Sequence, residues 1–166
     1  MRATSFIAAL SAVATASALK IFKPMQTVEE QKSTYEWDIT NWSAGCAASS
    51  CSYEFNVTAA ANTTTYPKRP AWSAYCHGEG EGAPYTLCDL NEKPATDLKV
   101  EAKLNPATRT GVNGTTANIQ ISLMHTDLDS PTTWWNYTAQ GEAKYNRAVA
   151  PPMTFSVNPS EFFGAA

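Results

Sequence analysis

Histidine, the side chain that most often serves as a general base, occurs at two positions of this 166-residue sequence, His77 and His125. His125 stands close to Ser122 and Asp127, and these are the three residue types of a hydrolase triad. In an extended strand, however, residues three apart face opposite sides, and the chain has no nucleophile-elbow motif. His77 stands in a glycine-rich stretch typical of a solvated loop. We predict no catalytic residue and no enzymatic activity.

Acidic residues cluster at two places, without the spacing of a known catalytic or metal site. Glu79 and Glu81 lie in the same glycine-rich stretch. Glycoside hydrolysis requires two carboxyl groups at a fixed separation, and a glycine-rich loop does not hold its side chains at a fixed separation. Asp127 and Asp129 lack the glycine and the later glutamate of an EF-hand calcium loop. A phosphate-binding glycine motif is also missing. We therefore predict neither a metal nor a cofactor.

The first residues have the three parts of a secretory signal peptide. Arg2 supplies a positive charge, residues 6–13 are mostly apolar, and residues 16–18, Ala-Ser-Ala, form a small-x-small cleavage signature. The apolar stretch is far shorter than the roughly 20 residues of a membrane span. We predict a signal peptide over residues 1–18, a flexible arm over residues 19–34, and one domain over residues 35–166 of a secreted, extracellular protein.

Secretion decides how the four cysteines are interpreted: Cys46, Cys51, Cys76 and Cys88. An even number of cysteines in a secreted chain indicates disulfides, whereas a zinc or redox site would favour Cys-x-x-Cys pairs. Three pairings are open. We favour Cys46 with Cys51 and Cys76 with Cys88, because each of these pairs flanks a turn signal.

In a secreted protein, Asn-x-Ser/Thr triplets are acceptors for N-linked glycans on the protein surface. The candidate glycosylation sites are Asn41, Asn56, Asn62, Asn113 and Asn136. We expect Asn56, Asn113 and Asn136 to be exposed. Asn41 falls on the apolar side of its strand, so we expect either a strand break or a bulge there.

Apolar and polar residues alternate along most of the chain, the pattern of half-buried strands. The pattern predicts about eight strands and no long helix, with turn-rich loops between them. The segments are YEWDIT, SYEFNVT, AWSAYC, PYTLC, DLKVEAKL, ANIQISL, WWNYTAQGEAKY and MTFSV. We predict an all-β domain, a single antiparallel β-sandwich or β-barrel stapled by disulfides.

Two neighbouring tryptophans begin the seventh of these segments. Adjacent residues of a strand face opposite sides, so one ring is directed outward. Strand parity places Trp135 in the core and Trp134 toward solvent, which makes Trp134 our candidate contact residue for a partner. The alternative is that one ring fills the core while the other only covers a neighbouring strand or lies under a glycan attached to Asn136.

The segments also resemble a known family. YEWDITNWSAGC, followed by CSYEFNVT, resembles the opening hairpin of fungal small secreted proteins related to the major Alternaria allergen. AWSAYCHGEGEGAPYTLC resembles the next part of that family, in which two cysteines flank a loop and are bonded to each other. The later strands fit loosely, and the resemblance covers about residues 35–158.

This resemblance implies a compact β-barrel or sandwich, secretion by a fungus, and no established enzymatic activity. Family members include allergens, elicitors of plant defence and candidate effectors. The chain lacks the allergen's cysteine pair near the C-terminus, and also a cysteine suited to an intermolecular bridge. We therefore expect a monomer.

Composition narrows the choice of partner. The net charge is −3 and the chain has no basic stripe or polybasic cluster, so we expect neither a nucleic acid nor a membrane as partner. We predict a secreted, non-catalytic protein of the effector, elicitor or allergen type, which binds a host extracellular protein or a cell-wall glycan. The alternatives are a carbohydrate-binding module that uses exposed tryptophan and, less favoured, a small secreted hydrolase.

Overall fold

The computed structural model describes residues 35–48, 50–106, 116–147 and 152–166. The predicted signal peptide, the predicted arm and Asn113 lie outside these residues. Within them every regular element is a strand, which confirms the all-β prediction. No helix in this part of the chain has the length and apolar character needed to cross a membrane.

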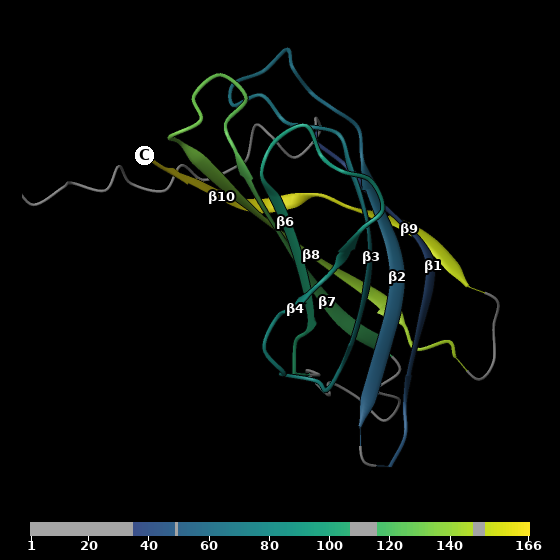
Figure 1. Ribbon diagram of the computed structural model, residues 1–166. Helices are drawn as coiled ribbons and strands as arrows, with labels where there is room; N and C mark the ends of the chain where they lie inside the picture. Colours follow the sequence, from purple (N-terminus) through teal and green to yellow (C-terminus); the bar gives the residue numbers. More distant parts are fainter. Residues whose placement is uncertain (1–34, 49, 107–115, 148–151) are drawn as a thin grey trace, which may run out of the picture.

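The strands form two five-stranded antiparallel sheets, in the orders β5-β3-β2-β1-β9 and β10-β8-β7-β6-β4. Figure 1 shows β3, β2, β1 and β9 on the right of the view and β10, β6, β8, β7 and β4 on the left. The bounds are β1 Trp37–Cys46, β2 Cys51–Ala59, β3 Trp72–Glu79, β4 Thr86–Leu87, β5 Asp89–Leu90, β6 Leu98–Leu104, β7 Thr116–Thr126, β8 Trp134–Lys144, β9 Met153–Val157 and β10 Pro159–Ala165.

The described residues hold ten strands, where the alternation pattern predicts eight. The segment PYTLC does not form one strand but leads into two short ones, because β4 pairs with β6 while β5 pairs with β3. The additional strand β10 begins at Pro159, at the edge of its sheet, where a residue without an N–H group is tolerated. β3 also continues into the predicted glycine-rich loop as far as Glu79.

The alternating residues point into the space between the sheets and form one core. The inward residues predicted for β2, β6 and β7 are buried, except for the half-buried Leu98. In β1 the alternation changes phase at a bulge between Thr40 and Ser43. Asn41 is exposed there with a positive φ of 56°, a conformation that asparagine tolerates better than most residues. The bulge turns Trp42 inward and confirms one of the two alternatives for Asn41.

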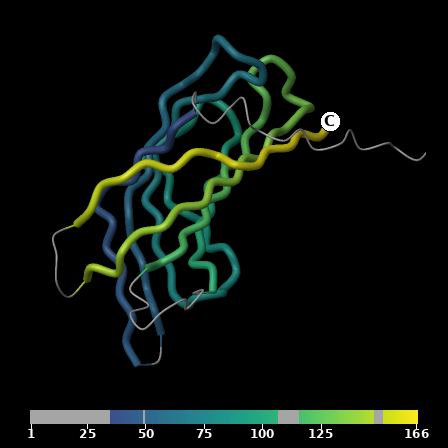
Figure 2. The backbone as a smooth tube through the Cα atoms, turned by 180° about the vertical axis from the view of Figure 1, so that it is seen from behind, coloured from purple at the N-terminus to yellow at the C-terminus, as the bar shows by residue number. Residues whose placement is uncertain are grey.

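The two sheets are joined by the C-terminal segment and by hydrogen bonds. β9 belongs to one sheet and β10 to the other, and Figure 2 shows this segment as one continuous band that passes across both. The Tyr53 hydroxyl of β2 donates to the Ala102 carbonyl of β6 at 2.8 Å. Trp42 Nε1 of β1 donates to the carbonyl of Lys144 of β8 at 2.9 Å. These links across the interior fit the sandwich form of the prediction.

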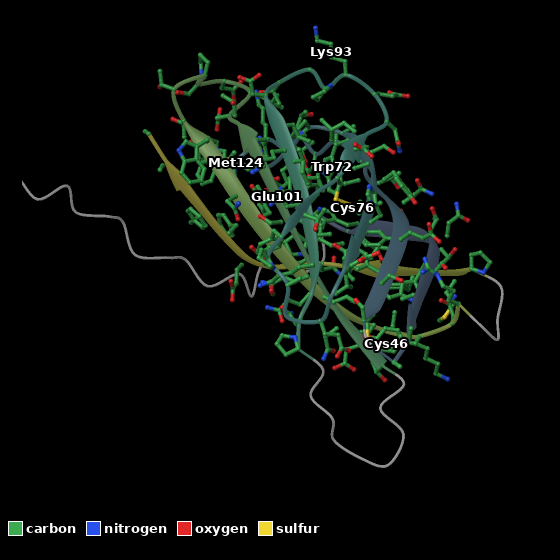
Figure 3. All side chains as sticks on the ribbon, turned by 60° about the horizontal axis from the view of Figure 1, so that its bottom comes forward. Cys46, Trp72, Cys76, Lys93, Glu101 and Met124 are labelled. Carbon is green, nitrogen blue, oxygen red and sulfur yellow. A yellow bond between two sulfur atoms is a disulfide. The ribbon has the colours of Figure 1, made fainter. Side chains whose placement is uncertain are left out.

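Both disulfides have the locally paired arrangement, which confirms that choice among the three pairings. Cys46 and Cys51 close the turn between β1 and β2. Cys76 of β3 is bonded to Cys88, which lies between β4 and β5. Figure 3 shows Cys46 and Cys76 in different parts of the molecule, so the two staples act on separate regions.

Candidate functional site

The structure does not assemble the hydrolase triad. Ser122 lies on the outer face of β7, where its Oγ accepts a hydrogen bond of 3.1 Å from Asn136. His125 faces the core, is 1% exposed, and stacks on the ring of Tyr137 with the ring centroids 5.8 Å apart. The two side chains therefore lie on opposite faces of the sheet, as parity predicts.

His125 and Asp127 are held by structural contacts. Burial is the largest influence on the pKa of His125 and lowers it, against the contact of Nδ1 with the Thr126 carbonyl at 2.9 Å, which raises it. Burial acts to raise the pKa of the Asp127 carboxyl. The hydrogen bonds from Trp135 and from the backbone amides of Asp129 and Ser130 together outweigh burial, so this pKa lies below its ordinary value.

Two of the other acidic candidates, Asp129 and Glu81, also have structural partners, whereas Glu79 is exposed at the end of β3. Asp129 forms an ion pair of 2.9 Å with Lys68. Glu81 accepts a hydrogen bond from the hydroxyl of Tyr145. A carboxylate oxygen of Glu81 lies within 4.8 Å of the sulfur atoms of Cys46 and Cys51, but both sulfurs are in a disulfide and are not thiolate ligands.

The outer face of the second sheet carries a half-buried tryptophan, Trp134, beside two exposed apolar side chains. Trp134 of β8 and Phe163 of β10 pack edge to face, with ring centroids 5.4 Å apart. Met124 of β7 is 38% exposed and Phe163 is 48% exposed. We call Trp134, Phe163 and Met124 the outer aromatic patch. Figure 3 shows Met124 on the same sheet as Glu101 of the next strand.

The pairing register of β10, β8, β7 and β6 places polar side chains beside the residues of this patch. Asn136 is paired with Phe163 on one side and with Met124 on the other, and Met124 is paired with Lys99 of β6. An open depression of about 450 Å³ runs along the same face, and Asp97, Lys99, Met124 and Trp134 contribute to its lining. Aromatic rings beside an amide and charged groups can bind a ligand that has both apolar and hydroxyl surfaces.

Trp135 lies on the inner side of β8, as its parity predicts, but it is half-buried at the rim of the core and not fully enclosed. Its Nε1 donates to Asp127 Oδ2 at 2.7 Å. The ring lies so close to Gly164 of β10 that an added Cβ there would be 2.5 Å from it. Trp134 is also half-buried, on the opposite face.

The described sequons lie at different levels of exposure. Asn41 is exposed, whereas Asn56, Asn62 and Asn136 are half-buried, so Asn56 and Asn136 are less exposed than predicted. The Asn62 side chain accepts hydrogen bonds from Thr64 in a turn. Neighbouring strands on both sides explain the partial burial of Asn136.

Sequence reasoning found Trp134 but missed Phe163 and Met124. Met124 has the outward parity of its strand, and this parity was a usable signal. Phe163 could be identified only by extending the alternation pattern past Pro159 to the end of the chain. Even so, its place beside Trp134 depends on the pairing of β10 with β8.

Fold and disulfides define the class of this protein as a disulfide-stapled antiparallel β-sandwich. No protein-family model, no curated protein and no solved structure matches the chain. The resemblance to the Alternaria allergen family therefore stays a prediction.

Proposed function

We propose that this chain is a secreted, non-catalytic binding protein of the fungal effector or elicitor kind, whose contact surface is the outer face of the second sheet around Trp134. The signal-peptide pattern and the two disulfides support an extracellular location. The separation of Ser122 and His125 onto opposite faces supports a binding role over hydrolysis.

The outer aromatic patch is the observation that carries this proposal. Exposed aromatic and methionine side chains that gather on one sheet face are typical of binding surfaces. The inner face of the same sheet already packs against the core, so the outward position of Trp134 and Phe163 contributes little to core burial.

A cell-wall glycan is the ligand class that the chemistry of this face favours. The apolar face of a sugar ring can lie on Trp134 or Phe163, and its hydroxyl groups can bond with Asp97, Lys99 and Asn136. The face combines opposite charges, since Asp97 and Lys99 border the same depression. This mixed character suits a neutral polysaccharide better than a strongly charged one.

The test is binding of the protein, produced with its disulfides but without glycans, to insoluble chitin, cellulose and β-1,3-glucan. Trp134→Ala should weaken binding to the preferred polysaccharide by about tenfold or more, since aromatic contacts of this kind contribute on the order of 1–2 kcal/mol. Trp135→Phe is the matched control, because it alters the neighbouring inward ring and should leave affinity unchanged. Equal binding by Trp134→Ala and the unmodified protein would contradict the proposal.

A further inference from the structure

Asn136 is a predicted glycan acceptor in the middle of the outer aromatic patch. It lies between Phe163 of β10 and Met124 of β7, with which it is paired directly. Trp134 stands two residues before it in β8, and residues two apart share a face at a spacing of about 7 Å. A sugar attached to Asn136 therefore has an apolar side chain on three of its sides.

We propose that Asn136 carries an N-linked glycan whose first N-acetylglucosamine lies on the outer aromatic patch and closes it to external ligands. This inference deepens the proposed function and depends on it for secretion through a glycosylating pathway. The occupant of the patch is then the protein's own sugar, and an external glycan binds only where Asn136 is unmodified.

The attachment step is the ordinary transfer from a lipid-pyrophosphate-linked oligosaccharide. The bond between the sugar C1 and the pyrophosphate oxygen breaks, and a bond between C1 and Asn136 Nδ2 forms. Nδ2 loses one of its two protons, and the lipid pyrophosphate is the leaving group. No oxidant or reductant is needed.

The hydrogen bond that Asn136 Nδ2 donates favours a sugar that extends toward Trp134. Nδ2 donates to the Ser122 hydroxyl at 3.1 Å, and Ser122 is paired with Thr138, one step along the sheet away from Trp134. After glycosylation the amide keeps one proton, which can preserve this bond. The sugar then takes the other position on Nδ2 and extends toward Trp134.

The sequon at Asn56 offers a matched contrast on the other sheet. Two residues before Asn56 stands Glu54, which is bonded to Tyr75 and Arg147. Asn56 is paired with Thr40 and with Tyr75, whose half-buried ring stacks on His77. A glycan at Asn56 therefore has one aromatic neighbour, in place of the three apolar side chains around Asn136.

The experiment uses the full chain secreted from yeast, with site occupancy measured by mass spectrometry of glycopeptides. Thr138→Val removes the Asn136 sequon and keeps a β-branched residue in the strand, and Thr58→Val makes the same change at Asn56. Both variants are also produced without any glycans, so that the effect of each substitution alone can be subtracted. Endoglycosidase H then trims each glycan to a single sugar.

We expect occupancy at Asn136 and a glycan-dependent fall in melting temperature of about 2–4 °C for Thr138→Val. Trimming to one sugar should preserve the stabilisation, and Thr58→Val should show a clearly smaller glycan-dependent shift than Thr138→Val. In a Trp134→Ala background the shift for Thr138→Val should disappear. Binding of a β-1,4-linked N-acetylglucosamine hexamer or of β-1,3-glucan should be at least about tenfold tighter for Thr138→Val than for the glycosylated protein.

Three results would overturn the inference: an Asn136 that carries no glycan in the secreted protein, a glycan-dependent shift that survives Trp134→Ala, or polysaccharide binding that is measurable and equal with and without the Asn136 glycan. Failure of the proposed function would give a different set of measurements. In that case neither form binds any polysaccharide, while the occupancy and melting measurements still decide whether the sugar lies on Trp134.

Discussion

Arg69 is fully buried, and its guanidinium carbon lies 4.8 Å from the ring centre of Tyr35 and 5.6 Å from that of Tyr137. Its three side-chain nitrogens have no partner with full hydrogen-bond geometry among the described residues. The ring of His125 stacks on that of Tyr137, with the ring centroids 5.8 Å apart. Burial raises the pKa of the Tyr137 hydroxyl, although a hydrogen bond between the guanidinium and this hydroxyl is one of the influences that act in the opposite direction. Aromatic faces thus replace a carboxylate as the surroundings of this cation.

His125 should make the folded state less stable as the pH falls. Burial lowers its pKa in the folded protein, whereas the unfolded chain has an ordinary value of about 6.5. Below that pH the unfolded chain takes up a proton that the folded protein does not, so stability is present above it and is lost as the pH decreases. Asp127, which acts to raise the pKa of His125, and Arg69, which acts to lower it, are the charged groups nearby.

Thermal melts between about pH 8 and pH 5 test this expectation. His125→Gln should show a smaller fall in melting temperature than the unmodified protein over this range. His77→Gln is the control, because it replaces the other histidine of the chain, at an exposed position. An unmodified protein that becomes more stable on acidification to pH 5 would contradict the assignment.

Arg69→Met should unfold with a free energy within about 1 kcal/mol of the unmodified protein, or above it. The substitution keeps the length of the side chain and removes a buried charge whose desolvation costs several kcal/mol. Arg69→Ala should be less stable by about 2–4 kcal/mol, because it leaves a cavity beside Tyr35 and Tyr137. Urea unfolding of the two variants distinguishes these effects. A loss above about 3 kcal/mol in Arg69→Met would mean that the guanidinium has acceptors that offset its burial.

At the scale of elements, β8 contributes side chains both to the outer face of its sheet and to the core. Its outward residues include Trp134 and Asn136, while Tyr137, Ala139 and Ala143 face the core. Gly141 lies within β8 and is paired with Ile119 of β7, so the strand and its hydrogen-bonded pairing continue through the glycine. The glycine is needed for the close approach of β9.

Gly141→Ala should destabilise the protein by about 1–3 kcal/mol, the usual cost of overpacking. An added Cβ would lie 2.5 Å from Val157 Cγ1 of β9. If this contact is the cause, Val157→Ala should relieve it, and the double variant should be more stable than the sum of the two single effects by about 1 kcal/mol or more. Denaturant unfolding of the four proteins measures this coupling. Additive effects would show that Gly141 is required for another reason.

At the scale of the molecule, contacts between distant parts of the chain hold the two sheets together. Asn146, which follows β8, donates to the Trp42 carbonyl at 2.8 Å and accepts from the Ala44 amide at 3.0 Å. The Cys76–Cys88 disulfide connects β3 to a segment whose two short strands belong to different sheets. The Cys46–Cys51 disulfide only closes a hairpin within one sheet.

Removal of the Cys76–Cys88 disulfide should therefore cost more stability than removal of Cys46–Cys51. Chain entropy predicts about 3 and about 2 kcal/mol for the two loops. Cys76 and Cys88 are buried, so paired replacement by alanine also removes core contacts there, whereas Cys46 is exposed. We expect a difference of about 1 kcal/mol or more between the two double variants in urea unfolding. The reverse order would mean that the first hairpin limits the stability of the whole sandwich.

The sequence determined most of the strands, their faces and the favoured disulfide pairs, because these depend on neighbours a few residues apart. Alternation with period two places Phe55 and Ile121 inward wherever their strands lie in the fold. The same rule separates Ser122 from His125 and Trp134 from Trp135. Each disulfide joins cysteines that flank a short stretch of chain, so local turn signals were enough to pair them.

Only the tertiary structure decided which strands become neighbours. Nothing local indicates that β10 pairs with β8, yet this pairing brings Phe163 to Trp134 and Asn136. The burial of Arg69 also depends on the tertiary structure, because it requires the rings of Tyr35 and Tyr137, which come from distant segments of the chain. The period of a strand fixes which way each side chain points, but not what stands beside it. That choice depends on how the whole chain buries its apolar faces, which no single segment can specify.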